Sequence, residues 1–487
     1  MGSRQTPTLT RFLFCLLPVY SAATESVASS TRSQDTDGNY TVSWNAPFLS
    51  LSGYGSEATS VLRGLVELSL SESLSTNTNR WNIAAGLSHG DSINYEYFQS
   101  LPESTRSIFL DAHSVQQTIT DSPQSTIVVC HSEPGAWSPE PFYESPHPCP
   151  PPLSSSTDRY RAVIGRTMFE TDRLPRGWEI RLNRMTEVWV TSAFQKKIFE
   201  EGGVTVPMRV VGQGIDVDVW NPDTTSSGKA TLTWEDMNAE GHCDESDYKF
   251  LSVFKWEPRK GYDLLLEAFW KAFVLPSLAN DYDNTTSASC LVIVTSTYHD
   301  DPSRIHTDLE RLWTQTIPPH STTKTNQARQ KIVFLSGLAP HDLIQLYNIA
   351  DAFVLPSRGE GWGRPYIEAM AMGLPVIATN WSGPTEFVTK HNGYLLPLNQ
   401  INPLVDAHLS AFPGHKWANP DGDKLVEILR HLREHPEEGR LKGAVGRRDV
   451  ETKWSHLVVS NLIRNELERV VASTSGAVDD DSVRNEL

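Results

Sequence analysis

The sequence predicts an α/β protein built from two facing domains, each a doubly wound parallel sheet. Its 487 residues exceed the size of one ordinary domain, so two domains of roughly 200 residues each are the natural expectation. In both halves, short apolar runs of strand length alternate with segments of helical periodicity, which is typical of parallel sheets covered by helices. A polar, turn-rich segment at residues 223–247 separates the two series, and we place the domain boundary there.

The first domain is expected to open with a strand at Tyr40, in the sequence Y-T-V-S-W. A glycine loop at residues 52–56 and a helix after Glu57 follow it, as at the start of a doubly wound sheet. Further strands are predicted at residues 108–110, 126–130 and 187–190. The proline-rich stretch at residues 138–156 is interpreted as a surface insertion.

The second domain repeats this alternation. Strands are predicted at residues 249–253, 291–294, 332–335, 352–355 and 376–378. Residues 318–330 are interpreted as a second insertion, and a helix at about residues 455–472 is long enough to pack back on the first domain. The resulting division is a signal peptide at 1–23, an N-terminal domain at 38–222, a C-terminal domain at 223–454, the returning helix at 455–472 and an acidic tail at 473–487.

The charge of the chain bears on its partners. The formal net charge is -17, which argues against a nucleic-acid partner because phosphate backbones require a basic surface. The net charge does not exclude a locally basic site that binds phosphate. Hydrophobic residues make up 39% of the chain, as in globular proteins.

The two ends of the chain predict the secretory pathway. Arg4 and Arg11 precede a short apolar run at residues 12–20 that small residues follow, as in a signal peptide. The run is shorter than a membrane-spanning helix, so we expect cleavage, with an uncleaved anchor as the alternative and peripheral membrane contact left open. The chain ends in R-N-E-L, which resembles endoplasmic reticulum retrieval signals. Sequons at Asn39 and Asn284 fit a lumenal location.

After removal of the signal, four cysteines remain: Cys130, Cys149, Cys243 and Cys290. An oxidising compartment permits up to two disulfides among three connectivities. The alternative is that Cys130 and Cys290 are buried thiols. Their spacing matches no metal motif, and we expect no metal site.

The most specific segment reads S-R-G-E-G-W-G-R-P-Y-I-E and carries two carboxylates, Glu360 and Glu368. Pro365 suits the first turn of a helix, and Gly373 suits its end. The segment therefore predicts a glycine-rich loop between a strand and a helix N-terminus, where open α/β sheets bind nucleotides and phosphates. A purely structural alternative is that Glu368 only favours its own helix as an acid of the first turn.

This segment closely resembles the E-x7-E signature of retaining glycosyltransferases of family four. The resemblance implies the GT-B fold, with a donor cleft between two Rossmann-like domains. It also implies that Glu360 contacts the sugar of a nucleoside diphosphate donor and that Glu368 accepts hydrogen bonds from the ribose hydroxyls. Ionised carboxylates are strong acceptors for paired hydroxyls.

A second segment, F-K-W-E-P-R-K-G-Y, resembles the region where the family neutralises the donor diphosphate. Lys260 matches the family lysine. Lys255 stands where arginine is usual, and Arg259 is expected to compensate for the lost bidentate fork. These cations would stabilise the charge that develops on the leaving diphosphate, so the reaction would require no metal and no other cofactor. A solvated basic turn is the structural alternative.

Other candidate donor-binding residues rest more on the resemblance. Gly53 and Gly55 would allow backbone N–H groups to approach the ligand, and Leu338 follows a strand where the family contacts the base. The remaining candidates lie in or near the two loops around Glu360, and they are Gly361, Ser382 and Gly383.

On the acceptor side, His131 follows a strand and is a candidate to bind a donor hydroxyl or to transfer the acceptor proton. A structural histidine is the alternative. Glu170 and Asp172 are weaker candidates on the same side. Asp216 and Asp218 form a D-x-D sequence, which we discount as a metal site because it lies in the predicted turn between the domains.

The resemblance implies transfer of a sugar, with retention of configuration, from a nucleoside diphosphate to a hydroxyl of a glycan, glycoprotein or glycolipid. A lumenal location favours a UDP-sugar. Two alternatives stay open: a catalytically idle sugar-binding or quality-control protein of the lumen, and a nucleotide-sugar epimerase, which shares the fold.

Overall fold

The computed structural model describes residues 39–50, 52–76, 80–88, 95–138, 147–223, 239–276, 289–297, 301–318, 331–404 and 412–481. Several predicted features therefore lie outside the described residues: the signal segment at 1–23, parts of both insertions, the sequon at Asn284 and the R-N-E-L terminus. Within the described residues, no helix has the length and apolar composition that a membrane crossing requires.

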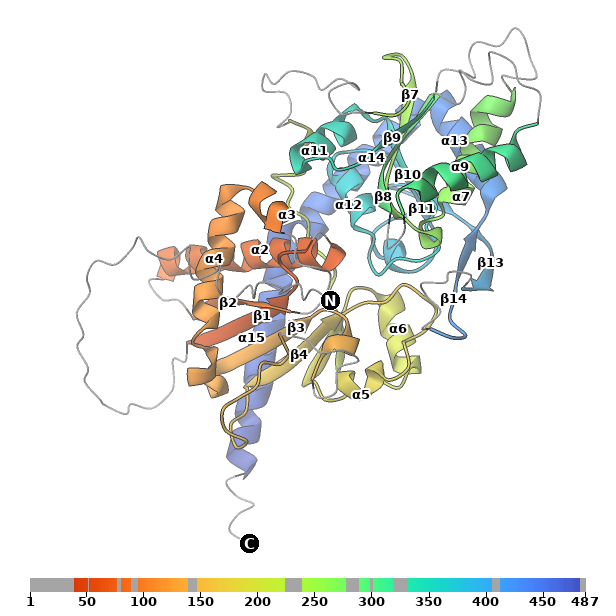
Figure 1. Cartoon of the computed structure of the whole chain (residues 1–487). Coiled ribbons are helices and arrows are strands. Elements are labelled where there is room, and N and C mark those ends of the chain that lie inside the picture. Colours follow the sequence, from red (N-terminus) through yellow and green to blue (C-terminus); the bar gives the residue numbers. More distant parts are fainter. Residues whose placement is uncertain are drawn as a thin grey trace, which may run out of the picture. The chain divides into compact units, whose positions relative to one another are not determined.

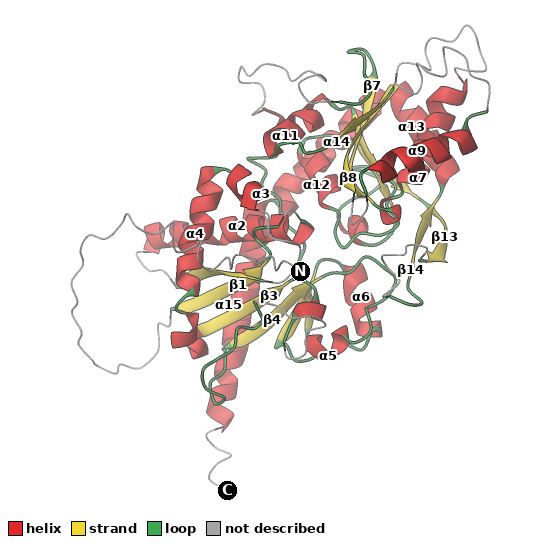
Figure 2. Ribbon diagram, viewed as in Figure 1, coloured by secondary structure: helices red, strands yellow, loops and turns green. Residues whose placement is uncertain are grey.

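The first sheet has the strand order β2-β1-β3-β4-β5-β6, and all its neighbouring strands run parallel (Figures 1 and 2). Its strands are β1 (Tyr40–Ala46), β2 (Trp81–Leu87), β3 (Thr126–His131), β4 (Ala162–Thr167), β5 (Glu187–Val190) and β6 (Met208–Val210). The predicted strands near Tyr40, at 126–130 and at 187–190 are confirmed.

The predicted strand at residues 108–110 is wrong, because these residues lie inside the helix α4 (Glu103–Gln116). Phe109 and Ala112 of α4 are buried while Leu110 is 55% exposed, which is the pattern of a one-sided helix and not of a buried strand. The other α-helices of this region are α2 (Gly53–Thr76), α3 (Tyr95–Ser100), α5 (Trp178–Leu182) and α6 (Ala193–Glu201).

The second sheet is also parallel, with the order β12-β11-β10-β7-β8-β9. Its strands are β7 (Tyr248–Trp256), β8 (Ser289–Thr297), β9 (Ile332–Leu335), β10 (Ala352–Leu355), β11 (Val376–Thr379) and β12 (Tyr394–Leu396). The five strands predicted for this half are confirmed. These strands are buried on both faces, and their sequences are the near-continuous apolar runs that parallel sheets require.

Six α-helices accompany this sheet in the described residues: α7 (Tyr262–Phe269), α9 (Ser303–Thr316), α11 (Pro340–Ile349), α12 (Arg364–Ala371), α13 (Gly422–Glu434) and α14 (Pro436–Asp449). An antiparallel hairpin joins β13 (Leu398–Pro403) to β14 (Lys416–Pro420). Its strands have mostly polar sequences and were not predicted.

The last helix, α15 (His456–Asp481), packs on the first sheet (Figure 1). Its Val459, Ile463 and Leu467 are buried in one cluster with Trp44 of β1 and Leu62 of α2. The two crossings between the sheets lie side by side, because Ile215 pairs with Ser455. The core of the first sheet is therefore built from both ends of the chain.

Both pairs of cysteines form disulfides, Cys130–Cys149 and Cys243–Cys290. The interpretation of Cys130 and Cys290 as buried thiols is thus wrong. Spacing alone did not identify the pairs, because the parallel crossovers decide which cysteines meet.

Candidate active site

Glu360 lies in the loop that connects the carboxyl end of β10 to α12. The loop ends at Gly363, whose φ of 101° is left-handed, and Pro365 occupies the first turn of α12. A glycine is required at 363 because its φ is unfavourable for other residues. The predicted order of strand, glycine-rich loop and helix is confirmed here.

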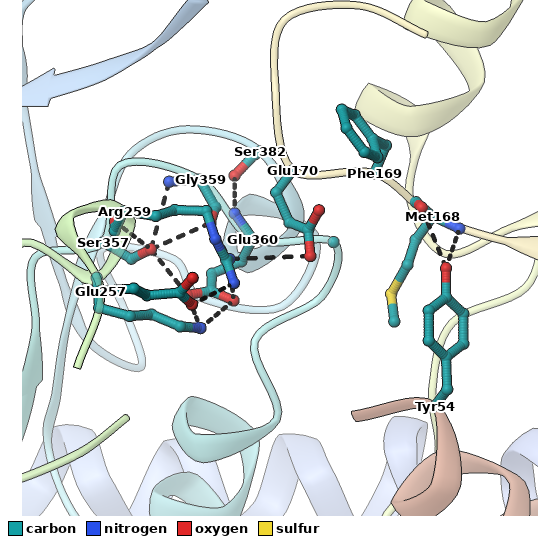
Figure 3. A network of polar contacts seen from close by, with 12 residues as sticks. Tyr54, Met168, Phe169, Glu170, Glu257, Arg259, Ser357, Gly359, Glu360 and Ser382 are labelled. Atoms are coloured by element: carbon teal, nitrogen blue, oxygen red, sulfur yellow. Dashed lines mark hydrogen bonds and ion pairs between the residues drawn. The ribbon is translucent and has the colours of Figure 1, made fainter. Parts of the chain in front are cut away.

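The carboxylate of Glu360 is surrounded by cations and donors (Figure 3). Lys260 donates from Nζ to both carboxylate oxygens, at 2.7 and 2.9 Å. Arg259 donates to Oε2 at 3.3 Å, and the Ser357 hydroxyl donates to Oε1 at 2.7 Å. The structure thus brings together Glu360, Lys260 and Arg259, three residues that sequence reasoning assigned to one site. We call this group, with Ser357, the Glu360 cluster.

Burial and charge act in opposite directions on Glu360, which is only 6% exposed. Burial disfavours the ionised carboxyl, but Lys260 and Arg259 outweigh it and lower the pKa of Glu360 below its ordinary value. The cluster therefore holds an ionised carboxylate against two cations at neutral pH.

Lys260 and Arg259 lie in a 3-10 turn (Pro258–Lys260) between β7 and α7. The turn is fixed by Gly261, whose φ is 71° and where an added Cβ would stand 2.2 Å from the Pro356 carbonyl oxygen. Arg259 also donates to Glu257 at 2.7 Å. Lys255, in contrast, lies within β7 opposite Ser296 of β8.

The loop after β11 supports Glu360 from the other side. The Glu360 N–H donates to the Ser382 hydroxyl at 3.0 Å, and the Gly383 N–H donates to the Glu360 carbonyl at 3.0 Å. Ser382 has a φ of 59° and a ψ of -147°, a conformation that costs of order 1–3 kcal/mol and is concentrated at functional sites. The predicted residues Ser382 and Gly383 therefore lie beside Glu360, with Gly361 next to it in sequence.

A loop from the first half, residues 168–173, packs directly on the Glu360 loop. An added Cβ at Gly359 would stand 2.0 Å from the Glu170 carbonyl oxygen, and one at Gly361 would stand 2.5 Å from the Met168 sulfur. Thr191 donates its hydroxyl to the Gly361 carbonyl at 2.7 Å. Figure 3 shows Met168, Phe169 and Glu170 following one another across from Glu360.

Replacing Gly359 with alanine is expected to destabilise the fold by about 2 kcal/mol, because the obstacle is a backbone carbonyl that has to shift. Gly53→Ala is the matched control, since nothing lies within 4 Å of its Cβ position, and we expect a change within about 0.5 kcal/mol. Urea unfolding at neutral pH measures both. Equal stability of the two variants would contradict the close packing of these loops.

Glu368 lies on α12, where Tyr347 donates to its Oε2 at 3.4 Å and Arg364 lies 3.8 Å from its Oε1. Burial raises the pKa of Glu368, and Arg364 only partly offsets this. Within the described residues it makes no ion pair with the Glu360 cluster. Leu338 lies two residues after Ser336 in the loop that follows β9 and is partly buried.

His131 is fully buried in a network of the first sheet. Trp44 donates from Nε1 to His131 Nδ1 at 3.0 Å, and His131 Nε2 lies 3.3 Å from Glu57 Oε2. Burial lowers the pKa of His131, so the ring is neutral, with its proton on Nε2 because Nδ1 accepts. Its lone pair is thus already used, and the structure does not bring His131 to the Glu360 cluster.

The same network contains a buried ion pair that the sequence did not reveal. Arg166 of β4 pairs with Glu57 of α2 and donates to the carbonyls of Val211 and Gly212, both at 3.0 Å. Burial would raise the pKa of Glu57, but Arg166 outweighs it and lowers the pKa to about 2. Glu57 had only been noted as the start of a helix, because a buried ion pair leaves no periodic signal.

The predicted glycine loop at residues 52–56 is corrected by the structure: Gly53 and Gly55 lie in the first turn of α2. An added Cβ at Gly55 would stand 2.4 Å from the Ser50 carbonyl, so this glycine serves a close backbone contact. Tyr54 between them donates its hydroxyl to the Met168 carbonyl at 3.2 Å. Tyr54 was missed because a lone tyrosine in a glycine loop carries no distinct signal.

Asp216, Asp218 and His456 form the one group in the described residues whose atoms lie close enough to hold a metal ion. Arg63 forms an ion pair with Asp216 and lies 3.8 Å from Asp218. A guanidinium already balances these carboxylates, as expected for a structural turn between the sheets.

Comparisons with known proteins agree with this architecture. Residues 321–412 match the family model of glycosyl transferases group 1. The crystal structure of Anabaena HepE in complex with UDP and glucose aligns with 88% of this chain and 100% of its own, with a TM-score of 0.57 at 14% identity. Sucrose-phosphate synthase from Thermosynechococcus elongatus aligns with 89% of this chain and 100% of its own, with a TM-score of 0.55 at 14% identity.

The chain has the GT-B fold. Its two parallel six-stranded sheets match those neighbours. Curated relatives include a GDP-mannose-dependent mannosyltransferase of phosphatidylinositol monomannoside from Corynebacterium glutamicum, 26% identical over 52% of this chain and 54% of its own length. Alpha-1,3/1,6-mannosyltransferase ALG2 from Rhizomucor pusillus is 26% identical over 47% of this chain and 48% of its own length. The chain thus spans about half the length of these relatives. Together with the family model, they support the assignment of this chain as a glycosyltransferase.

Proposed function

We propose that this chain is a retaining glycosyltransferase that moves a sugar from a nucleoside diphosphate to a hydroxyl of a glycan, glycoprotein or glycolipid. The observation that carries the proposal is the Glu360 cluster, in which Lys260 and Arg259 converge on a buried carboxylate at the carboxyl end of a parallel sheet. Sites of this kind bind the phosphates of nucleotides.

In the proposed reaction, the donor diphosphate lies against Lys260 and Arg259, which take up the charge that grows on it as the glycosidic bond breaks. Glu360 is then free to accept hydrogen bonds from the sugar. Glu368 accepts hydrogen bonds from the ribose hydroxyls, with Tyr347 and Arg364 holding its carboxylate in place. Because two side-chain cations serve the diphosphate, we propose that the reaction needs no metal and no other cofactor.

The nucleotide base of the donor and the cellular location of the protein belong to the same proposal. The signal-like start and the R-N-E-L end favour the endoplasmic reticulum lumen, where a UDP-sugar is our proposed donor. The neighbour bound to UDP and glucose supports a nucleotide-sugar donor, whereas one relative is named as GDP-mannose-dependent. The nucleotide base of the donor is therefore the first property to measure.

Thermal melting of the purified protein with UDP, GDP and ADP tests the proposal. We expect UDP to raise the melting temperature most, since a ligand at 100 times its dissociation constant stabilises by about 2.7 kcal/mol. Glu368→Ala should weaken binding of that nucleotide by about 10-fold or more, because a hydrogen bond to a charged acceptor is lost. Glu437→Ala, at an exposed carboxylate of α14, is the control and should not change it.

No stabilisation by any of the three nucleotides would refute the proposed donor class. Unchanged affinity in Glu368→Ala would refute the role of that residue. Analysis of the product separates sugar transfer from epimerisation of the donor, because only transfer joins the sugar to an acceptor.

A further inference from the structure

Glu170 is a carboxylate that the proposed donor chemistry does not use. It enters the site from the first half of the chain, and Figure 3 shows its side chain directed toward Arg259 and Glu360. Its Oε1 lies 3.9 Å from the Arg259 guanidinium, which also contacts Glu360 at 3.3 Å. Together with Glu257, at 2.7 Å, these contacts place Arg259 among three carboxylates, of which Glu170 alone comes from the first half of the chain.

The backbone around Glu170 is held in place by both halves of the chain. Phe169 donates its N–H to Gln195 at 2.9 Å, and Asp172 donates its N–H to the Lys416 carbonyl of β14 at 3.0 Å. Lys416 in turn donates its N–H to the Asp172 carboxylate at 2.7 Å, and the Thr171 hydroxyl lies 2.7 Å from His415 Nδ1. Asp172 and His415 therefore fix the loop, and Asp172 is a structural residue.

The Glu170 side chain is less constrained than its backbone. It is 34% exposed, against 8% for that of Glu360. In the described part of the chain its one ion pair is the contact with Arg259. The site thus presents a fixed but accessible acceptor group beside the cations that would hold the diphosphate.

Retention of configuration requires the acceptor to approach from the face that the diphosphate leaves. A side chain that receives the acceptor proton would therefore stand beside the diphosphate-binding cations, and Glu170 lies 3.9 Å from one of them, Arg259. We propose that Glu170 is the catalytic base that receives the proton of the acceptor hydroxyl. This inference rests on the proposed function.

In this step the acceptor O–H bond breaks and its proton passes to a carboxylate oxygen of Glu170. The acceptor oxygen forms the new bond to C1 of the sugar with the released electron pair. The bond between C1 and the diphosphate breaks, and its electron pair leaves with the diphosphate, whose charge lies against Lys260 and Arg259. Glu170 then returns the proton to solvent.

The surroundings of Glu170 make its carboxylate more basic than an ordinary glutamate. Burial raises the pKa of Glu170, Arg259 and Lys260 lower it, and Glu360 and Glu257 raise it again, so that the net shift is upward. Tyr54 also faces it from α2, and burial raises the pKa of that hydroxyl as well, so Tyr54 stays neutral. Turnover should therefore fall as the pH drops through the raised pKa of Glu170.

The test compares wild type with Glu170→Gln and Glu170→Ala. Donors are UDP-glucose, UDP-N-acetylglucosamine and GDP-mannose, and acceptors are a panel of octyl glycosides. If no glycoside is used, hydrolysis of the donor replaces transfer, with water as the acceptor. We expect both variants to bind the nucleotide within about 2-fold of wild type and to transfer at least about 100-fold more slowly. The acid limb of the pH profile should disappear in Glu170→Gln.

Asp172→Asn is the matched control from the same loop. It should keep the acid limb, because it acts only through the position of the loop. Transfer by either Glu170 variant within about 3-fold of wild type would overturn the inference, and so would an equal loss of nucleotide binding and transfer. If wild type itself neither binds a nucleotide nor turns over a donor, the proposed function fails, and this result is distinct from the other two.

Discussion

Replacing Glu360 with glutamine is expected to lower sugar transfer by about 10²–10³-fold, the range found when one preorganised charged or polar group is removed from an active site. The substitution keeps the shape of the side chain but removes the charge that balances Lys260 and Arg259. These cations would then be more available to a diphosphate. We therefore expect UDP to bind as tightly as in wild type or more tightly, while turnover is lost.

Glu257→Gln is the matched control for this experiment. Glu257 also forms an ion pair with Arg259, at 2.7 Å. Its contact with Lys260 is through the backbone, where the Lys260 N–H donates to the Glu257 carbonyl at 3.0 Å. We expect a loss of turnover of less than about 10-fold, as for a positioning contact that leaves the reacting groups in place. Rates are measured at saturating donor, and affinity is measured by calorimetry with UDP. A Glu360→Gln variant that turns over within about 3-fold of wild type would contradict the assigned role.

The largest loss of stability is expected for Arg166→Met. This change leaves Glu57 as a buried carboxylate without its guanidinium partner and also removes the hydrogen bonds to the carbonyls of Val211 and Gly212. Breaking a buried ion pair from one side costs about 3–5 kcal/mol. Urea unfolding at pH 7 measures the loss. Arg464→Met is the control, because its pair with Glu72 is partly exposed and contributes at most about 1 kcal/mol.

The same variant should change the response to acid. The pKa of Glu57 is lowered from 4.5 to about 2 in the folded protein, so the pair stabilises the fold fully above pH 4.5 and loses this effect as the pH falls toward 2. Loss of this effect lowers the free energy of unfolding by about 3 kcal/mol. In Arg166→Met this contribution is absent, so the free energy of unfolding should fall less between pH 5 and pH 3. Parallel curves for the two proteins would show that Glu57 is not stabilised by Arg166.

The sequence predicted the loop of Glu360 and the nearby position of Lys260 because the signals of both segments are local. The strand before Glu360, the glycine at 363 and the proline at 365 together determine a loop that feeds a helix, and Lys260 follows a strand of the same parallel sheet. Parallel strands end at a common edge, so residues 100 positions apart meet there. This reasoning needs only the strand assignments to be correct.

The first half was harder to predict for physical reasons. Residues 108–110 are too few to distinguish period two from period 3.6, and the surrounding segment forms α4. The role of His131 stays a prediction, because a histidine after a strand has the same sequence pattern whether it binds substrate or accepts a hydrogen bond from Trp44. The hairpin of β13 and β14 was missed because its stability depends partly on contacts with residues 171 and 172.

The position of α15 has a consequence for biosynthesis. Val459, Ile463 and Leu467 complete the apolar core beneath β1, yet they leave the ribosome after the whole second sheet has been made. The half of the molecule that is translated first therefore cannot close its interior until residues 459–467 have been made. A chain that stops before residue 459 would expose Trp44 and Leu62, and it would be a substrate for chaperones while its other half was already folded.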